Sequence, residues 1–374
     1  MNGNIRIGKL FGIPFFINPS WFLVLALVTL TYGNGLATQF PALPPGTPLL
    51  LGLLTALLLF ASVLLHELAH SAVALRQGIG VQSITLFLFG GLASLEDESK
   101  TPAEAFWVAI AGPLASLGLF GVLTLAGITL PLAGPLAAIL AVLTYVNLAL
   151  ALFNLIPGLP LDGGNILKAA IWKLTGNPYQ GVKVASRVGQ AFGWLAIASG
   201  LLPLVLYGSF GNIWNLLLGW FLLRNAGQSA QFASLQERLT GLTAADATLA
   251  NSPVIAAEMS LREFADQQIL HHSTWRKFLV TNSEAQLLGE IAIDDLKTVP
   301  VEQWSETPVT ALVRAIEPAT IVVENQPLLD VVKVLETNHL PALPVVQANG
   351  ALLGLLEKAA VIHLLQRQPH VASA

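Results

Sequence analysis

Long uncharged apolar runs dominate the first 230 residues and constrain the fold more than any other feature of the chain. A helix needs about 20 mostly apolar residues to cross a bilayer, and six segments reach or approach this length. They are residues 14–33, 50–75, 104–128, 135–157, 185–207 and 212–226. The last two are interpreted either as two spans or as one re-entrant hairpin. The sequence therefore predicts an α-helical membrane protein with about six transmembrane helices.

Charged residues divide the chain into two parts. Only 11% of all residues are charged, against roughly 25% in soluble proteins. Residues 1–230 contain nine Lys or Arg and six Asp or Glu, whereas residues 231–374 contain nine and sixteen. We therefore predict a transmembrane domain over residues 1–226, a polar linker over residues 227–243, and a soluble part beyond it.

The basic residues of the first part predict its orientation. With six spans and a cytosolic N-terminus, all nine fall in or beside cytosolic segments, and the loops near 34–49, 129–134 and 208–211 contain none. Cytosolic loops of membrane proteins carry an excess of Lys and Arg. We expect a multi-pass protein of the lipid bilayer of a cell or inner membrane, with its N-terminus and its soluble part in the cytosol. The net charge of −4 gives no reason to expect a nucleic-acid partner.

Three ionisable groups interrupt the second predicted span in the segment HELAH, residues 66–70. Histidines four apart lie on one helix face, so His66 and His70 can bind one Zn²⁺ and Glu67 can act as a general base. Ionisable groups inside a span are costly and mark functional sites. A proton relay or an ion-transport pathway uses the same residue types, and a buried hydrogen-bonded cluster is the structural alternative.

A catalytic zinc site needs a third protein ligand and one open position, and Asp162 is the candidate for this ligand. It is the only acid between residues 105 and 230, and it lies in a segment whose prolines and glycines interrupt an apolar helix. Broken helices occur at membrane depth only where protein buries them or where they line a cavity. The alternative is that Asp162 caps the helix expected near Asn165. The chain has no cysteine, which excludes thiolate ligands and thiol catalysis.

Two shorter features complete the first part. Residues 79–96 have β-branched and aromatic residues in partial alternation, followed by two glycines, which predicts one or two short strands. Within the third predicted span, Gly112-Pro113 is interpreted as a kink that serves packing.

Three separated segments resemble the site-2 protease family of intramembrane zinc metalloproteases. They are HELAH at 66–70, AGPLASL at 111–117 and FNLIPGLPLDGG at 153–164. The resemblance covers residues 1–226 and implies an enzyme that hydrolyses a peptide bond within or near a transmembrane segment of a membrane-anchored protein, in regulated intramembrane proteolysis. Pro-Leu stands before the aspartate, where the family's tightest form has Asn-Pro.

The resemblance also implies a role for each residue of the site. His66, His70 and Asp162 would bind one zinc ion, and Glu67 would be the general base. Asn154, eight residues before the aspartate, would help to hold the substrate carbonyl or the attacking water. Alternatively, Asn154 only satisfies backbone groups freed by a nearby proline. The extended segment 84–94 would clamp an unwound substrate by β-addition; a strand without substrate contact is the alternative.

The soluble part contains an internal repeat. Residues 245–300 and 307–366 each predict the order strand, helix, strand, strand, helix. They resemble tandem CBS domains, which we place at residues 244–300 and 301–374. The resemblance implies a cytosolic α/β pair that regulates the enzyme, with a homodimer through this pair as a further expectation.

Adenine nucleotides are a common ligand of CBS pairs. The family's nucleotide-binding residues correspond to four positions in this chain. Only Asp295 matches the family's nucleotide-binding residues; Ala292, Glu357 and Ala360 do not. Asp295 is therefore a candidate ribose ligand, and a helix cap is the alternative. An adenine nucleotide is an open expectation, whereas one zinc ion per chain is the main cofactor expected.

Two functions remain open on these grounds. The first is an intramembrane zinc metalloprotease modulated by a CBS pair. The alternative is a CBS-gated ion channel or transporter, in which the four ionisable residues of the site line an ion pathway.

Overall fold

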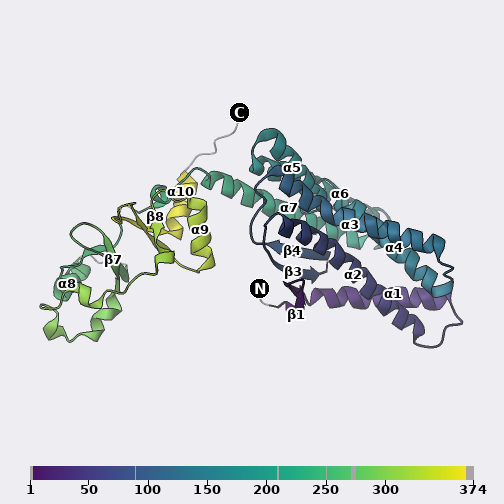
Figure 1. The fold of residues 1–374 in the computed structure, drawn as a ribbon, viewed down its shortest axis with the longest axis horizontal. Coiled ribbons are helices and arrows are strands. Elements are labelled where there is room, and N and C mark those ends of the chain that lie inside the picture. Colours follow the sequence, from purple (N-terminus) through teal and green to yellow (C-terminus); the bar gives the residue numbers. More distant parts are fainter. Residues whose placement is uncertain (1–2, 89, 209, 250, 271–274, 368–374) are drawn as a thin grey trace. The chain divides into compact units, whose positions relative to one another are not determined.

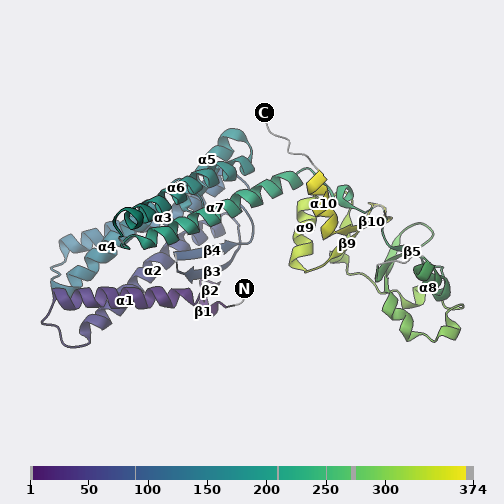
Figure 2. The same cartoon turned by 180° about the vertical axis from the view of Figure 1, so that it is seen from behind.

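The computed structural model describes residues 3–88, 90–208, 210–249, 251–270 and 275–367 (Figures 1 and 2). The chain forms two compact units, Met1–Ser234 and Leu235–Ala374. The first unit holds the long apolar helices and the second holds the two small α/β modules.

The helices of the first unit are long and mostly apolar. They are α1 (Ser20–Gln39), α2 (Thr47–Arg76), α3 (Pro102–Thr129), α4 (Gly134–Asn154), α5 (Asp162–Thr175), α6 (Pro178–Tyr207) and α7 (Ile213–Leu239). Within the described part of the chain, five of them are long and apolar enough to cross a membrane: α1, α2, α3, α4 and α6. Helix α3 contacts both α2 and α4, and α2 also contacts α4.

The prediction of about six spans differs from this at the C-terminal end of the unit. The sixth predicted span, residues 212–226, is the first half of α7, which is not among the five. The helix then continues to Leu239 through residues that are polar and that the sequence suggested to be a linker. A bilayer core about 30 Å thick requires about 20 apolar residues, and the apolar half of α7 is shorter than this.

A four-stranded sheet accompanies the helices. Its strands are β1 (Ile5–Leu10), β2 (Ile13–Ile17), β3 (Val81–Phe87) and β4 (Gly90–Leu95). They lie in the order β1-β2-β3-β4. The β1–β2 and β3–β4 pairs are antiparallel, and β2 and β3 are parallel. The predicted strands at 79–96 are therefore present as a hairpin; Phe89, at its turn, lies outside the described residues.

The first two strands were not predicted. The first predicted span began at residue 14, whereas residues 13–17 form β2 and α1 begins only at Ser20. Asn18-Pro19-Ser20 separates the apolar strand from the apolar helix, but three residues change a hydropathy average over a span length very little, so the boundary was overlooked. The boundary is visible in the structure at Asn18, whose Oδ1 accepts a hydrogen bond from the Ser20 N–H at 3.0 Å.

The sheet packs against α2, and this packing positions the candidate site. One cluster joins Ala74 of α2 to Ile13 and Ile84 of the sheet. A second joins Ile17 and Leu86 to α2 through Phe60 and Val63, which are partly buried, and includes Trp21 of α1. The two clusters hold the sheet along α2 on both sides of the HELAH turn. The edge strand β4 therefore lies beside this turn.

The second unit consists of two similar modules. The first has β5 (Val254–Ala256), α8 (Leu261–Leu270), β6 (Lys277–Thr281) and β7 (Leu287–Ala292), and the second has β8 (Val322–Val323), α9 (Leu328–Thr337), β9 (Ala342–Val346), β10 (Leu352–Glu357) and α10 (Lys358–Arg367). In each, a first strand pairs parallel to the middle strand and the third pairs antiparallel to it. The predicted internal repeat is thus a repeat of structure, except that the helix expected at the end of the first module is the short 3₁₀ helix Ile293–Thr298, whereas the second ends in α10.

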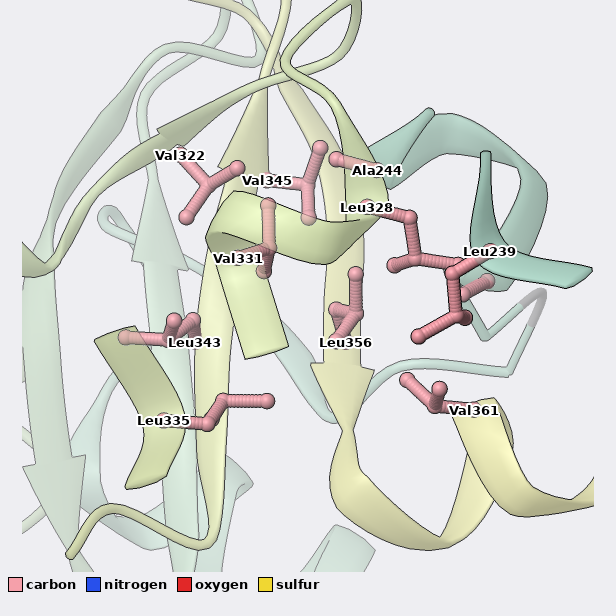
Figure 3. Close-up of a cluster of buried hydrophobic side chains, with 11 residues drawn as sticks. Leu239, Ala244, Val322, Leu328, Val331, Leu335, Leu343, Val345, Leu356 and Val361 are labelled. Atoms are coloured by element: carbon pink, nitrogen blue, oxygen red, sulfur yellow. The ribbon is translucent and has the colours of Figure 1, made fainter. Parts of the chain in front are cut away.

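The cores of the modules are not continuous in sequence. Leu239 and Ala244, which precede the first module, are buried in the core of the second, against Leu328 and Leu356 (Figure 3). Conversely, Val309 is buried in the core of the first module. The core of each module therefore includes residues from a segment outside its own strands. This packing joins the two modules.

Candidate metal centre

Helix α2 presents two histidines on one face. His66 and His70 are four residues apart in the C-terminal half of an uninterrupted helix, so they lie one turn apart. Their ring centroids are 4.9 Å apart, and the residues are only 3% and 9% exposed. Two imidazoles buried in an apolar helix need partners, because an unpaired polar group in such surroundings is costly.

Asp162 is the partner common to both histidines. Its Oδ2 lies 3.0 Å from His66 Nε2 and 3.3 Å from His70 Nε2. The ligand atoms of the three residues all lie within 4.8 Å of one another. Two residues one turn apart on α2 thus meet a third that is 96 positions away from the first in the chain.

The turn before α5 places the aspartate. Asp162 is the first residue of α5, and Leu161, the N-cap residue, makes no side-chain capping bond. The turn is held against α6 by a hydrogen bond from the Leu159 N–H to the Ala185 carbonyl, at 3.1 Å. The side chain of Asp162 is directed at the histidines. The sequence left open that Asp162 caps a helix beginning near Asn165. The helix instead begins at Asp162 itself, so Asp162 does not have that position.

Helix α3 contacts the other side of both imidazoles. His70 Nδ1 lies 2.6 Å from the Val108 carbonyl oxygen. Because a carbonyl only accepts, Nδ1 of His70 carries the proton. His66 Nδ1 lies 2.9 Å from Ser116 Oγ. Both Nε2 atoms are thereby left to face Asp162.

Gly112 completes the contact with α3. A Cβ atom placed on it would overlap Nε2 of both histidines. The sequence interpretation gave Gly112-Pro113 a packing role only and did not identify Val108 or Ser116. Their spacing on one face of a predicted span, together with a serine in apolar surroundings, was the available signal.

The residues fit a zinc ion. Two neutral imidazole nitrogens and one carboxylate oxygen form a ligand set typical of catalytic zinc. Ligand atoms around a tetrahedral zinc are separated by about 3.3 Å, close to the 3.0 and 3.3 Å found here. Among the described residues Asp162 forms ion pairs with these histidines and with no Lys or Arg. A bound cation would therefore supply the positive charge that this buried carboxylate needs, because its other partners are the two imidazoles.

Glu67 lies beside this cluster and outside the ligand set. Its carboxylate is directed at β4, where a Cβ atom on Gly91 would overlap its side chain. The absence of a side chain on this strand residue makes room for the carboxylate. A carboxylate next to a metal site and against a sheet edge is positioned to exchange protons with groups brought there.

Two further predicted residues are not members of the His-His-Asp cluster. Asn154 is the last residue of α4, and the turn 155–161 leads from it to Asp162. It is half-buried, and its role stays a prediction. Asp295, in the second unit, accepts a hydrogen bond from the Ala292 N–H at 2.9 Å and forms an ion pair with Arg314. Both of its oxygens are engaged within the module, as in the helix-cap alternative; a nucleotide role also stays a prediction.

Comparisons with known proteins agree with this site. Residues 54–135 and 129–196 match the model of Peptidase family M50, and residues 312–367 match that of the CBS domain. The first match includes His66 and His70.

Relatives match nearly the whole chain. A Synechocystis sp. protein provisionally named as a zinc metalloprotease, sll0528, is 56% identical over 366 residues, which cover 98% of this chain and 96% of the relative. Zinc metalloprotease MJ0392 of Methanocaldococcus jannaschii is 30% identical over 312 residues, 83% of this chain and 84% of the relative. The solved structure of a site-2 protease from the same organism is 30% identical, with a TM-score of 0.44, and covers 61% of this chain and 95% of that one.

The length and identity of the match to the Synechocystis relative, together with a His-His-Asp cluster suited to zinc, establish the class of the protein. The chain belongs to the site-2 protease family, peptidase family M50, and is a zinc metalloprotease with an appended CBS module.

Proposed function

We propose that this enzyme hydrolyses a peptide bond within or near a transmembrane segment of a membrane-anchored protein. The observation that carries the proposal is the position of the His66–His70–Asp162 cluster. Two of its members lie within α2, a helix long and apolar enough to span a membrane. A hydrolytic centre at that depth meets peptide bonds that are themselves inside the bilayer.

Each residue of the site has a distinct part in the proposed reaction. His66, His70 and Asp162 hold the zinc ion, which when bound polarises a carbonyl and lowers the pKa of water. Glu67 takes the proton from the attacking water and delivers it to the leaving amine nitrogen. Asn154 supports the developing negative charge on the carbonyl oxygen.

Substrate binding is assigned to β4. A transmembrane helix hides its peptide bonds in internal hydrogen bonds, so it must unwind before cleavage. β4 is an edge strand of the described sheet, and Gly91 within it contacts Glu67. An unwound substrate segment added to this edge by β-augmentation would pass next to the carboxylate.

The topology and the regulation are also proposals. The positions of the basic residues support a cytosolic N-terminus and a cytosolic CBS pair. This CBS pair modulates proteolysis. It does so either by binding an adenine nucleotide or by forming a homodimer, and both can be tested. The contacts of Asp295 with Ala292 and Arg314 mean that a nucleotide binding there has to displace an existing ion pair.

The decisive variant is Glu67→Gln, which preserves the shape of the side chain and removes its basicity. We expect stoichiometric zinc to remain, and cleavage of a membrane-anchored substrate to fall by about 10²–10⁴-fold, the usual contribution of a general base. Substrates are found by comparing membrane proteomes of cells with wild-type and variant enzyme. Asp97→Asn is the matched control, because this acid is exposed in the loop after β4.

Two results would contradict the proposal. Undiminished cleavage by Glu67→Gln would show that Glu67 is not the base. A set of fragments that depends on the enzyme but consists only of soluble proteins would show that the substrate is not a membrane segment.

A further inference from the structure

Three residues of α3 contact the candidate ligands at successive turns. Val108, Gly112 and Ser116 are four apart, so they lie on one face of the helix. Val108 contacts the ring of His70, Ser116 contacts the ring of His66, and Gly112 lies against Nε2 of both. All three are on the face of α3 that packs on α2.

We propose that this face of α3 is a positioning element for the metal, which selects the nitrogen that each histidine offers and keeps the space for the ion. The inference rests on the zinc site of the proposed function and assigns no chemical step to α3. Its members act through the histidines and are positioning residues.

The selection follows from hydrogen-bond chemistry. A neutral imidazole has one protonated and one unprotonated nitrogen, and only the unprotonated one binds a metal. The Val108 carbonyl can only accept, so it fixes the proton of His70 on Nδ1 and leaves the Nε2 lone pair free. The Ser116 hydroxyl, which can donate as well as accept, accepts from His66 Nδ1 when Nε2 is the unprotonated nitrogen, and so stabilises the same tautomer. Both free nitrogens then point at the oxygen of Asp162.

The sequence Gly112-Pro113 explains why α3 can do this. Proline has no N–H, so the Ala109 carbonyl lacks its helical donor, and the ring crowds that turn. The freed carbonyl is the neighbour of that of Val108, which accepts from His70. Glycine at 112 lets the helix backbone approach the two Nε2 atoms while leaving open the volume that a Cβ would occupy.

The role of Ser116 is tested by zinc affinity in the full-length purified protein, measured by competition with a chromophoric chelator and without substrate. Ser116→Ala should weaken zinc binding by about 10–100-fold, the usual effect of losing a partner of a ligating histidine, and Ser116→Thr, which keeps the hydroxyl, should restore most of it. The matched control is Ser71→Ala. Ser71 is 1% exposed and adjacent to His70, but its hydroxyl donates to the Glu67 carbonyl.

The role of Gly112 is tested with a second matched pair. Gly112→Ala should abolish stoichiometric zinc and change the visible absorption of the Co²⁺-substituted protein. Gly118→Ala, on the same helix, should leave both unchanged, since a Cβ there meets no atom within 4 Å. Thermal unfolding in excess chelator shows whether each variant keeps the metal-free fold.

Wild-type affinity in Ser116→Ala, or a wild-type Co²⁺ spectrum in Gly112→Ala, would overturn the inference. An equal loss in Ser71→Ala or Gly118→Ala would also overturn it, because the effect would then be one of general packing. The proposed mechanism is tested separately. If Glu67→Gln retains cleavage, Glu67 is not the general base, but the zinc affinities of the Ser116 and Gly112 variants still decide the role of α3.

Discussion

At the scale of single residues, the three candidate ligands differ in how they are held. Each histidine is fixed on its outer side by α3, through Ser116 or Val108. Asp162 contacts the two Nε2 atoms and is positioned by the turn that precedes it. The aspartate is therefore the ligand whose orientation depends most on the metal itself.

Replacing Asp162 tests this difference. Asp162→Asn keeps the shape of the side chain but removes its charge, and we expect zinc affinity to fall by more than the 10–100-fold typical of losing an indirect partner. Chelator competition on the purified protein measures it, with Asp97→Asn as the control. Affinity equal to wild type would mean that another residue supplies the third ligand.

The sequence predicted residues whose side chains carry a chemical signal. The spacing of His66 and His70 and the isolation of Asp162 in an apolar stretch were sufficient to nominate all three. Val108 acts through a backbone carbonyl and Gly112 through the absence of a side chain. The side chain of neither residue indicates its role, so the tertiary structure was needed to find them.

At the scale of elements, a buried polar contact joins α2 to α4. Asn147 is fully buried, and its Nδ2 donates to Ser62 Oγ at 3.1 Å and to the Leu143 carbonyl at 2.8 Å. Among the described residues its Oδ1 has no hydrogen-bond partner. Ser62 lies one turn before His66 on α2, so this contact is close in sequence to the ligands.

Asn147→Leu measures what this contact contributes to stability. The variant loses an interhelical hydrogen bond, worth about 0.6 kcal/mol on average in membrane proteins. It also removes a buried unpaired oxygen, which costs about 1–3 kcal/mol. We therefore expect unfolding free energy equal to wild type or higher, measured by denaturant titration in detergent, and unchanged zinc affinity. Asn147→Ala is the control, because it leaves a cavity and should destabilise.

A loss of more than about 2 kcal/mol in Asn147→Leu would contradict this expectation, since one buried hydrogen bond rarely contributes that much. It would indicate that the asparagine has partners beyond Ser62 and Leu143, and that the α2–α4 contact is a structural requirement.

Element types were predictable where one periodicity ran uninterrupted. The helices α2, α3 and α4 are close to their predicted bounds because each apolar run ends at residues of a different kind, such as Arg76-Gln77 at the end of α2 and the Thr101 cap before α3. β2 was merged with α1 because only Asn18-Pro19-Ser20 separates two apolar segments, which is too short an interruption to divide a predicted span. The apolar first half of α7 resembled a span, and its polar second half resembled a linker, although they form one helix.

At the scale of the whole molecule, the candidate ligands and the CBS module belong to different compact units. His66, His70 and Asp162, together with their partners on α3, all lie in the unit Met1–Ser234. The sequence predicted this division from charge. It could not predict that the two CBS cores exchange segments, because Ala244 and Val309 pack against strands distant in the chain.

Removing the second unit should therefore separate metal binding from regulation. A chain ending at Ser234 is expected to bind zinc with the affinity of the full protein, whereas under the proposed regulation its rate of substrate cleavage should not respond to an adenine nucleotide. Metal analysis and cleavage assays in reconstituted vesicles measure the two properties. Loss of zinc from the shortened chain would show that the metal site depends on the second unit.

The edge position of β4 has a consequence for the products of the enzyme. In a strand, successive side chains point to opposite faces, and the hydrogen-bonding pattern repeats every two residues. A substrate paired with β4 can slip along it only in steps of two if the same side chains are to face α2. Alternative cuts in one substrate would then be separated by even numbers of residues, so the fragments would form a ladder of dipeptide mass differences.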